Sequence, residues 1–209
     1  MEEIIQRAIQ RKKIALEILN EIDLIEKWGE VGEAHLVGAT AYNLMVNHDI
    51  DIETFCNIPC PENVFKVLGH LAAHRGVVEI KFHNYMNSPL NGLYSKLTYR
   101  YPDNTEGTLW NVDMWLFPSN HRGPLSRDLV GFMNKVLTDR SRKSILDIKE
   151  HLVRLGLNYP SVFIYRAVLV DGIEGIHHFL DWMNNQDLNE TFKLETLTVK
   201  ESGADHDRK

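Results

Sequence analysis

The sequence has few cysteines, no long apolar run and no excess of positive charge, and each absence narrows the class of protein. Two cysteines among 209 residues fit a reducing compartment. Because no stretch of about 18 apolar residues occurs, we expect no membrane-spanning helix. The acidic start, Met1-Glu2-Glu3-Ile4, lacks the basic segment that opens a signal peptide, so a cytoplasmic protein is expected.

The charge balance also limits the partners. The formal net charge is −6 and the isoelectric point is about 5.9. Proteins that bind nucleic acid broadly present a basic field, so this balance weakly disfavours that function. A local exception is Arg140-Ser141-Arg142-Lys143, which is either a helix start capped by Ser141 or a phosphate clamp.

Hydrophobic periodicity predicts an α+β chain. An apolar stripe at helical spacing predicts one long helix over residues 2–27. Three segments with alternating or strongly strand-forming residues, 77–84, 93–101 and 108–117, are joined by short turn-rich links and predict an antiparallel meander. Two more strands are expected over 34–38 and 49–55, with further helices over 40–46, 61–74, 126–137, 142–155 and 160–185.

A polar stretch with proline and glycine, residues 118–124, is the expected domain boundary. We therefore predict an α+β domain over residues 1–118 and a helical region over 119–190. Residues 191–209 are expected to form a short strand or a disordered tail.

An acidic pair stands at the start of one expected strand, in Asp49-Ile50-Asp51-Ile52-Glu53. Side chains alternate between the two faces of a strand, so Asp49 and Asp51 share a face opposite Ile50 and Ile52. Two neighbouring carboxylates repel each other unless a cation lies between them, and oxygen ligands suit a divalent cation. A solvated strand face is the alternative, and Glu53 is not expected to be a ligand.

A glycine turn, Val37-Gly38-Ala39-Thr40, lies just upstream of the acidic pair. A tight turn that leads into a helix presents backbone N–H groups to which a phosphate can bind. The turn and the two aspartates together predict a site for a metal-bound nucleoside triphosphate.

A third carboxylate, Asp113, is the only charge in the apolar strand candidate Trp110–Phe117. An isolated charge in such a strand is paired or metal-bound. The alternative to metal binding is an ion pair with Lys81 or Arg100.

These segments resemble the nucleotidyltransferase superfamily that includes DNA polymerase β. The family signature is a glycine turn, a helix, an acid-hydrophobic-acid strand and a third acid on a later strand. The resemblance covers residues 30–118 and is nearest to small bacterial antibiotic-modifying or abortive-infection toxin nucleotidyltransferases. Ala39 departs from the family, which has glycine or serine at that position, and so cannot offer a hydroxyl to a phosphate.

The resemblance implies a mixed-sheet nucleotidyltransferase core that transfers a nucleoside monophosphate from a triphosphate such as ATP to an acceptor hydroxyl and releases pyrophosphate. The strand of Asp113 would lie beside the strand of Asp49 and Asp51, so that the three acids share one site. Asp49, Asp51 and Asp113 would be catalytic and would hold one or two Mg²⁺ ions. The nucleotide would contact Gly38, Ala39 and Thr40. A small-molecule acceptor is slightly favoured over a tRNA or a protein.

Two alternatives remain open. Ala39 favours a catalytically inactive nucleotide-binding or interaction protein of the same fold. A metal hydrolase would combine the same acids with His35, His48 or His83. A zinc site built from Cys56, Cys60, His70 and His74 is not expected, because a short turn explains the cysteine spacing.

Overall fold

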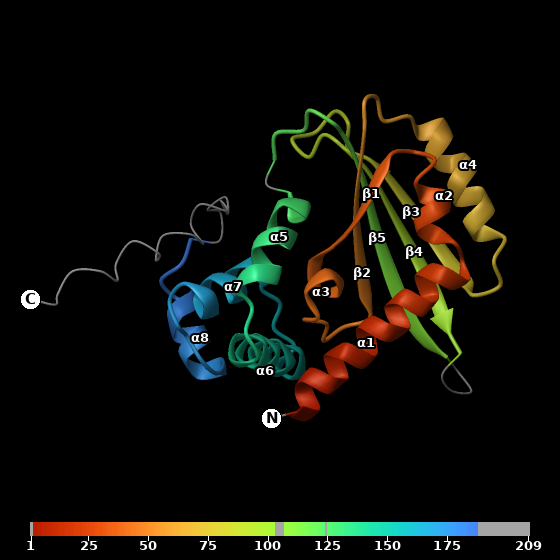
Figure 1. The fold of residues 1–209 in the computed structure, drawn as a ribbon. Helices are drawn as coiled ribbons and strands as arrows, with labels where there is room; N and C mark the ends of the chain where they lie inside the picture. Colours follow the sequence, from red (N-terminus) through yellow and green to blue (C-terminus); the bar gives the residue numbers. More distant parts are fainter. Residues whose placement is uncertain (1, 103–106, 124, 188–209) are drawn as a thin grey trace, which may run out of the picture. The chain divides into compact units, whose positions relative to one another are not determined.

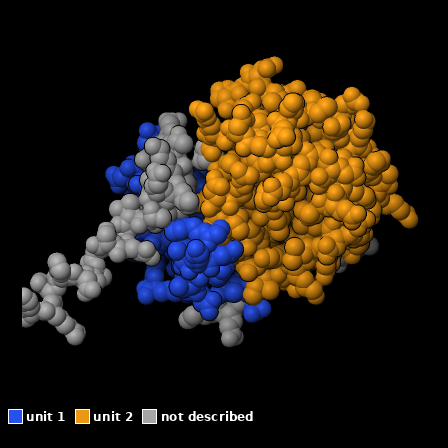
Figure 2. Space-filling view, turned by 45° about the horizontal axis from the view of Figure 1, so that its top comes forward, with its two compact units in different colours: residues 1–6, 131–209 blue, residues 7–130 orange. Residues whose placement is uncertain are grey.

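The computed structural model describes residues 2–102, 107–123 and 125–187. The strand or tail expected over 191–209 lies outside these described residues. The chain divides into two compact units, coloured orange and blue in Figure 2. We call them the sheet unit (Arg7–Val130) and the helical unit (residues 1–6 and 131–209) and describe each by itself. The domain boundary expected after residue 118 stays a prediction.

The sheet unit contains a mixed five-stranded sheet with the order β1-β2-β5-β4-β3 (Figure 1). Strand β2 pairs antiparallel with β1 and parallel with β5, whereas β5, β4 and β3 form an antiparallel meander. The predicted α+β class, the meander and the adjacency of the two acidic strands are therefore confirmed. The strands span Glu33–Val37 (β1), Asp49–Cys56 (β2), Val77–Asn84 (β3), Leu93–Tyr101 (β4) and Thr108–Pro118 (β5).

Three helices, α1 (Glu2–Glu21), α2 (Leu24–Trp28) and α4 (Pro61–Ala72), supply the apolar side chains that cover one face of the sheet (Figure 1). The even-numbered residues 50–54 of β2 and 110–116 of β5, among them Ile52 and Met114, point into this core and are almost fully buried. The indole of Trp28 reaches the same core and donates a hydrogen bond to Thr54 Oγ1 at 2.8 Å. Strand alternation therefore leaves the odd-numbered residues of β2 and β5 on the opposite face.

The single helix predicted over residues 2–27 is wrong, because the chain breaks between α1 and α2. Asp23 at the break has φ 50° and ψ 36°, in the left-handed region that ends a helix. Aspartate reaches this region more readily than most residues. The apolar stripe nevertheless continues into α2, so the periodicity gave no sign of the break.

Two further helices begin on the other side of the sheet. The glycine turn opens α3 (Gly38–Tyr42), which is shorter than the helix predicted over 40–46, and Ser126 opens α5 (Ser126–Val136). The carboxylate of Glu53, only 8% exposed, accepts hydrogen bonds from the backbone N–H groups of Ser126 and Arg127, each at 2.9 Å. Glu53 therefore anchors the first turn of α5 to β2.

The helical unit contains α6 (Asp139–Leu155), α7 (Ser161–Leu169) and α8 (Ile176–Met183). Thr138 caps α6 in a capping box whose N3 residue is Ser141, so the predicted cap at Ser141 lies three residues too late. Arg140 pairs with Glu174 at 2.8 Å. The helix predicted over 160–185 is two helices, because Gly172 and Gly175 adopt positive φ between them. None of the helices described is long and apolar enough to cross a bilayer.

Candidate functional site

The face of the sheet opposite the core carries the residues that the sequence singled out. We call it the polar face and define it by the odd-numbered residues of β2 and β5 and their neighbours on β4. Strand register arranges these residues in rows that run across the strands. From one end of β5 to the other, the rows pass through Asn111, Asp113, Trp115 and Phe117.

The second row holds two of the predicted acids side by side. Asp51 of β2 is the direct register partner of Asp113 on the parallel neighbour β5. On the other side of Asp113, Lys96 of β4 is its antiparallel partner. Like charges directly opposite each other destabilise a sheet, so a cation near Asp51 and Asp113 would relieve their repulsion.

The first row holds the third acid. Asp49 lies opposite Asn111, whose Nδ2 donates a hydrogen bond to Asp49 Oδ1 at 2.9 Å. Among the residues that the structure describes, no three His, Cys, Asp or Glu side chains form a ready-made metal cluster. The structure thus brings Asp51 and Asp113 together, with Asp49 one row away on the same face and held by an amide.

A tyrosine holds the carboxylate of Asp113 in place. Tyr94 Oη donates a short hydrogen bond to Asp113 Oδ1. Burial raises the pKa of Tyr94 above its usual range, and the hydrogen bond to Asp113 and the negative charges of Asp113, Tyr85 and Asp51 raise it further. The phenol therefore remains a donor at neutral pH, and among the described residues no hydrogen bond to Asp113 Oδ2 is seen.

The glycine turn packs directly against the row of Asp51 and Asp113, which we call the acidic row. Gly38 has φ 63°, and a Cβ at this position would collide with Asp51 Oδ2, so only glycine lets the turn approach this carboxylate. Thr40 is fully buried and its hydroxyl is 3.4 Å from the Asp49 carbonyl oxygen, to which it donates. The side chain of Thr40 thus holds the turn against β2, and the backbone N–H groups at the start of α3 are the donors that a phosphate would meet.

The alternative ion pairs for Asp113 are not what the structure contains. Lys81 Nζ lies 3.0 Å from Glu79 Oε2, and Arg100 is opposite Leu109, two rows from Asp113. The side chain that holds Asp113 is instead Tyr94.

The histidines considered for a metal hydrolase are scattered. The ring of His48 packs against Trp110 at 4.7 Å, and that of His83 stacks on Tyr85 at 5.6 Å. His35 lies opposite Glu53 and has Nε2 3.3 Å from Glu33 Oε1. This contact is not a hydrogen bond, and Nε2 is buried without a hydrogen-bond partner among the described residues. None of the three forms a metal cluster with the described acids.

The sequence did not identify Tyr94 and Asn111, which hold the carboxylates in place. Both lie on strands that were predicted, and alternation alone puts Tyr94 on the same face as Lys96. The missing information was the register between strands, which decides that Tyr94 reaches Asp113 and that Asn111 faces Asp49.

Comparison with known proteins gives distant likenesses only. No protein-family model matches the chain, and no curated protein matches its sequence. Among solved structures, small alarmone synthetase 1 of Bacillus subtilis is 9% identical, with 72% of this chain and 91% of that chain covered and a TM-score of 0.38. Small alarmone synthetase 2 of the same organism is 11% identical, with coverages of 86% and 95% and a TM-score of 0.37. A GTP pyrophosphokinase family protein of Streptococcus pneumoniae is 12% identical, with coverages of 74% and 87% and a TM-score of 0.35. At such scores these likenesses carry no argument about this chain.

Proposed function

We propose that this protein is a metal-dependent nucleotidyltransferase that moves a nucleoside monophosphate from a nucleoside triphosphate to an acceptor hydroxyl and releases pyrophosphate. One observation carries the proposal: the Gly38 turn packs on Asp51, and Asp51 lies in register with Asp113 on the adjacent parallel strand. This proximity supports a site in which the glycine turn binds a phosphate beside the two carboxylates.

The donor set fits a hard divalent cation. Asp51 and Asp113 offer carboxylate oxygens on one face of the sheet, and Asp49 adds a third in the adjacent row. These residues would hold one or two Mg²⁺ ions. Bound at this site, Mg²⁺ would neutralise charge on the triphosphate and on the departing pyrophosphate.

The protein groups supply the rest of the chemistry. Backbone N–H groups of Gly38, Ala39 and Thr40 hold phosphate oxygens, since Ala39 has no hydroxyl and that of Thr40 is used within the fold. The acceptor oxygen attacks the α-phosphorus while the bond to the bridging oxygen of pyrophosphate breaks. Asp113 either completes the metal site or takes the proton of the acceptor hydroxyl on Oδ2, and Tyr94 keeps its carboxylate oriented.

Lys96 is the cation nearest to this row by register. It lies opposite Asp113, is half-buried and forms no ion pair that is seen among the described residues. An ammonium in this position can contact a phosphate oxygen of the bound triphosphate, which complements the charge on the Asp51–Asp113 pair. We therefore assign Lys96 a phosphate contact in the transition state.

The test follows label from the α- and γ-phosphates of all four nucleoside triphosphates into a panel of hydroxyl acceptors in the presence of Mg²⁺. Transfer of α-label with release of γ-labelled pyrophosphate is expected, and Asp51→Asn or Asp49→Asn should lower its rate by about 10²–10³-fold. Glu62→Gln makes the same charge change on the exposed surface of α4, away from the polar face, and should leave the rate unchanged.

Three results would contradict the proposal. Transfer that survives Asp51→Asn would show that the reaction does not need the carboxylate of Asp51. Transfer of γ-label with release of the nucleoside monophosphate would make the enzyme a pyrophosphotransferase. Calorimetry that detects nucleotide binding without dependence on Mg²⁺, with no transfer at all, would favour the inactive nucleotide-binding alternative.

A further inference from the structure

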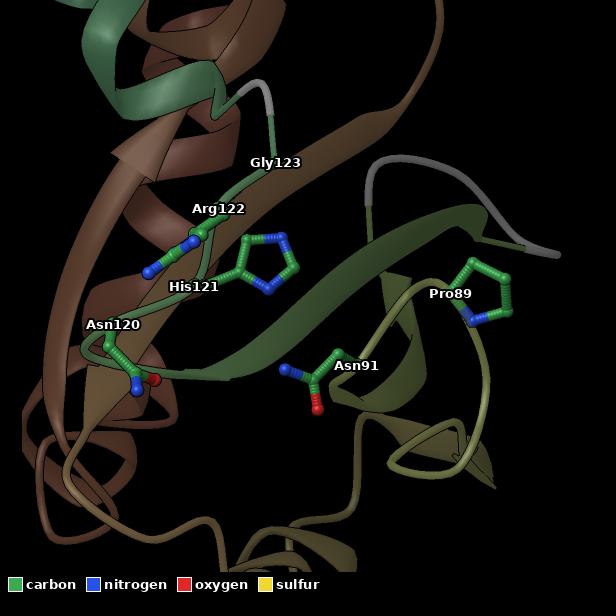
Figure 3. A pocket seen from close by; sticks show the side chains of 6 residues that line it. All are labelled: Pro89, Asn91, Asn120, His121, Arg122 and Gly123. Atoms are coloured by element: carbon green, nitrogen blue, oxygen red, sulfur yellow. The ribbon is translucent and has the colours of Figure 1, made fainter.

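A pocket of about 460 Å³ lies between two loops of the sheet unit (Figure 3). Two loops form it. The β3–β4 loop contributes Pro89 and Asn91, and the β5–α5 loop contributes Asn120, His121, Arg122 and Gly123. Figure 3 shows the His121 ring projecting toward the loop that carries Pro89 and Asn91. We call this the loop-end pocket.

The lining of the loop-end pocket suits an anion. Arg122 is its one permanently charged side chain, no carboxylate lines it, and the chain as a whole carries a net charge of −6. Within the described part of the chain Arg122 has no ion-pair partner, and Asn91 and Asn120 add two carboxamides that can donate hydrogen bonds. A guanidinium fork with neighbouring amides matches the oxygens of a carboxylate or a phosphate.

One nitrogen in this pocket lacks a partner. His121 Nδ1 is buried and forms no hydrogen bond with any described group. An atom this buried is not accessible to a ligand, so the polar contacts that the pocket offers come from Arg122, Asn91 and Asn120. The imidazole packs against Phe117, with ring centroids 4.4 Å apart, and its Nε2 lies close to Gly123.

An aromatic run connects this pocket with the acidic row. Trp115 follows Asp113 on the same face of β5, and its ring lies parallel to that of Phe117, at 5.2 Å and 4°. Phe117 in turn contacts His121. Four residues of strand separate Asp113 from Phe117, which corresponds to about 13 Å. Phe117 is only 8% exposed and lies between the rings of Trp115 and His121, so a ligand that reaches from Asp113 to the pocket would pass along Trp115.

We propose that the loop-end pocket binds an anionic group, a carboxylate or a phosphate, of the acceptor, whose planar or apolar middle lies along Trp115. The identification of the ligand as the acceptor rests on the proposed transferase function, whereas the anion site itself does not depend on it. The donor triphosphate belongs at Gly38, near the start of β2, whereas the pocket lies beyond the ends of β2 and β5. The two anionic groups are thus bound at opposite ends of the same face.

The experiment titrates the full-length protein with phenyl phosphate and, in a separate arm, with benzoate, in the absence of Mg²⁺ and nucleotide. Calorimetry gives the affinity, and the ring signals of His121, assigned by comparison with His121→Gln, report the location. We expect saturable binding of at least one probe, shifts of the His121 signals, and a loss of affinity of at least tenfold in Arg122→Gln. The stronger arm identifies a phosphate or a carboxylate as the group bound.

Two control variants test whether a loss of probe binding is specific to Arg122. Arg75→Gln removes an exposed arginine elsewhere in the sheet unit, and Asp51→Asn alters the acidic row, so both should bind the probe as the wild type does. Equal affinity in Arg122→Gln and the wild type, an absence of binding, or displacement of the probe by ATP would overturn the proposal. Because nucleotide and metal are absent from the titration, its failure is distinguishable from failure of the transferase assay.

Discussion

At the scale of single residues, the acidic row is arranged at a cost to stability. Asp51 and Asp113 face each other in register on neighbouring strands, and like charges in that relation destabilise a sheet. In protein freed of divalent cations, Asp51→Asn should therefore raise the free energy of unfolding by about 0.2–1 kcal/mol. Urea unfolding with a chelator measures it, with the exposed Asp181→Asn as the control that should change little. A lower stability of Asp51→Asn would mean that the two carboxylates do not repel each other.

Much of this row could be predicted from single residues. The alternation of Asp49 and Asp51 with Ile50 and Ile52 fixed which side chains share a face, and the isolated charge of Asp113 indicated a role for it. The polar contacts around the row could not be predicted. Whether Thr40 offers its hydroxyl to a ligand or to the fold depends on a 3.4 Å contact with a backbone oxygen nine residues away, which no local pattern reveals.

At the scale of elements, the carboxylate of Glu53 anchors the start of α5 to β2, beside the contact of Arg127 with the Phe55 ring. Both oxygens of Glu53 accept backbone N–H groups of the first turn of α5, and the carboxylate also complements the positive end of the helix. Glu53→Gln replaces one acceptor oxygen with a donor and leaves a buried N–H without a partner, so it should lower the free energy of unfolding by about 1–3 kcal/mol. Urea unfolding measures the loss.

The matched control for this change is Glu62→Gln. Glu62 pairs with Lys66 at 3.0 Å on the exposed surface of α4, where the same substitution should cost less than about 1 kcal/mol. If both variants lose the same small amount, the anchoring role of Glu53 is wrong. The sequence placed Glu53 on the acidic face but gave no reason to connect it with residues 126–127, because that contact depends on the path of the β5–α5 loop.

Some boundaries of helices and strands have local signals in the sequence, and others do not. Strands β3 and β4 have the predicted limits because alternation and turn residues are local signals. The breaks at Asp23 and at Gly172 and Gly175 depend on left-handed backbone conformations, which side-chain periodicity does not record. The order of strands in the sheet required the resemblance, since no local pattern fixes a parallel pairing across three intervening elements.

At the scale of the whole molecule, stability should fall at alkaline pH. Burial raises the pKa of both Tyr94 and Tyr99, and hydrogen bonds to Asp113 and Glu21 respectively raise them further. A raised pKa in the folded state means that the unfolded chain loses the phenolic protons first. The contribution to stability is therefore complete below the ordinary tyrosine pKa of about 10 and is lost as the pH rises through the folded values.

Unfolding free energies measured at intervals between pH 7 and 12 check this. The difference between the wild type and the double variant Tyr94→Phe/Tyr99→Phe should be constant up to about pH 9.5 and should change steeply above it. A difference that stays flat through pH 12 would mean that neither phenol has a raised pKa in the fold.

The parallel pairing of β2 with β5 also has a consequence for the order in which the chain is made. Parallel neighbours require the chain to return to the end from which it started, and sixty-two residues separate Asp49 from its hydrogen-bonding partner Asn111. A nascent chain on the ribosome displays the glycine turn and the first two aspartates, together with α4 and the β3–β4 hairpin, before β5 has been synthesised. The charged row on which the proposed chemistry depends therefore cannot exist in any N-terminal fragment that stops short of β5.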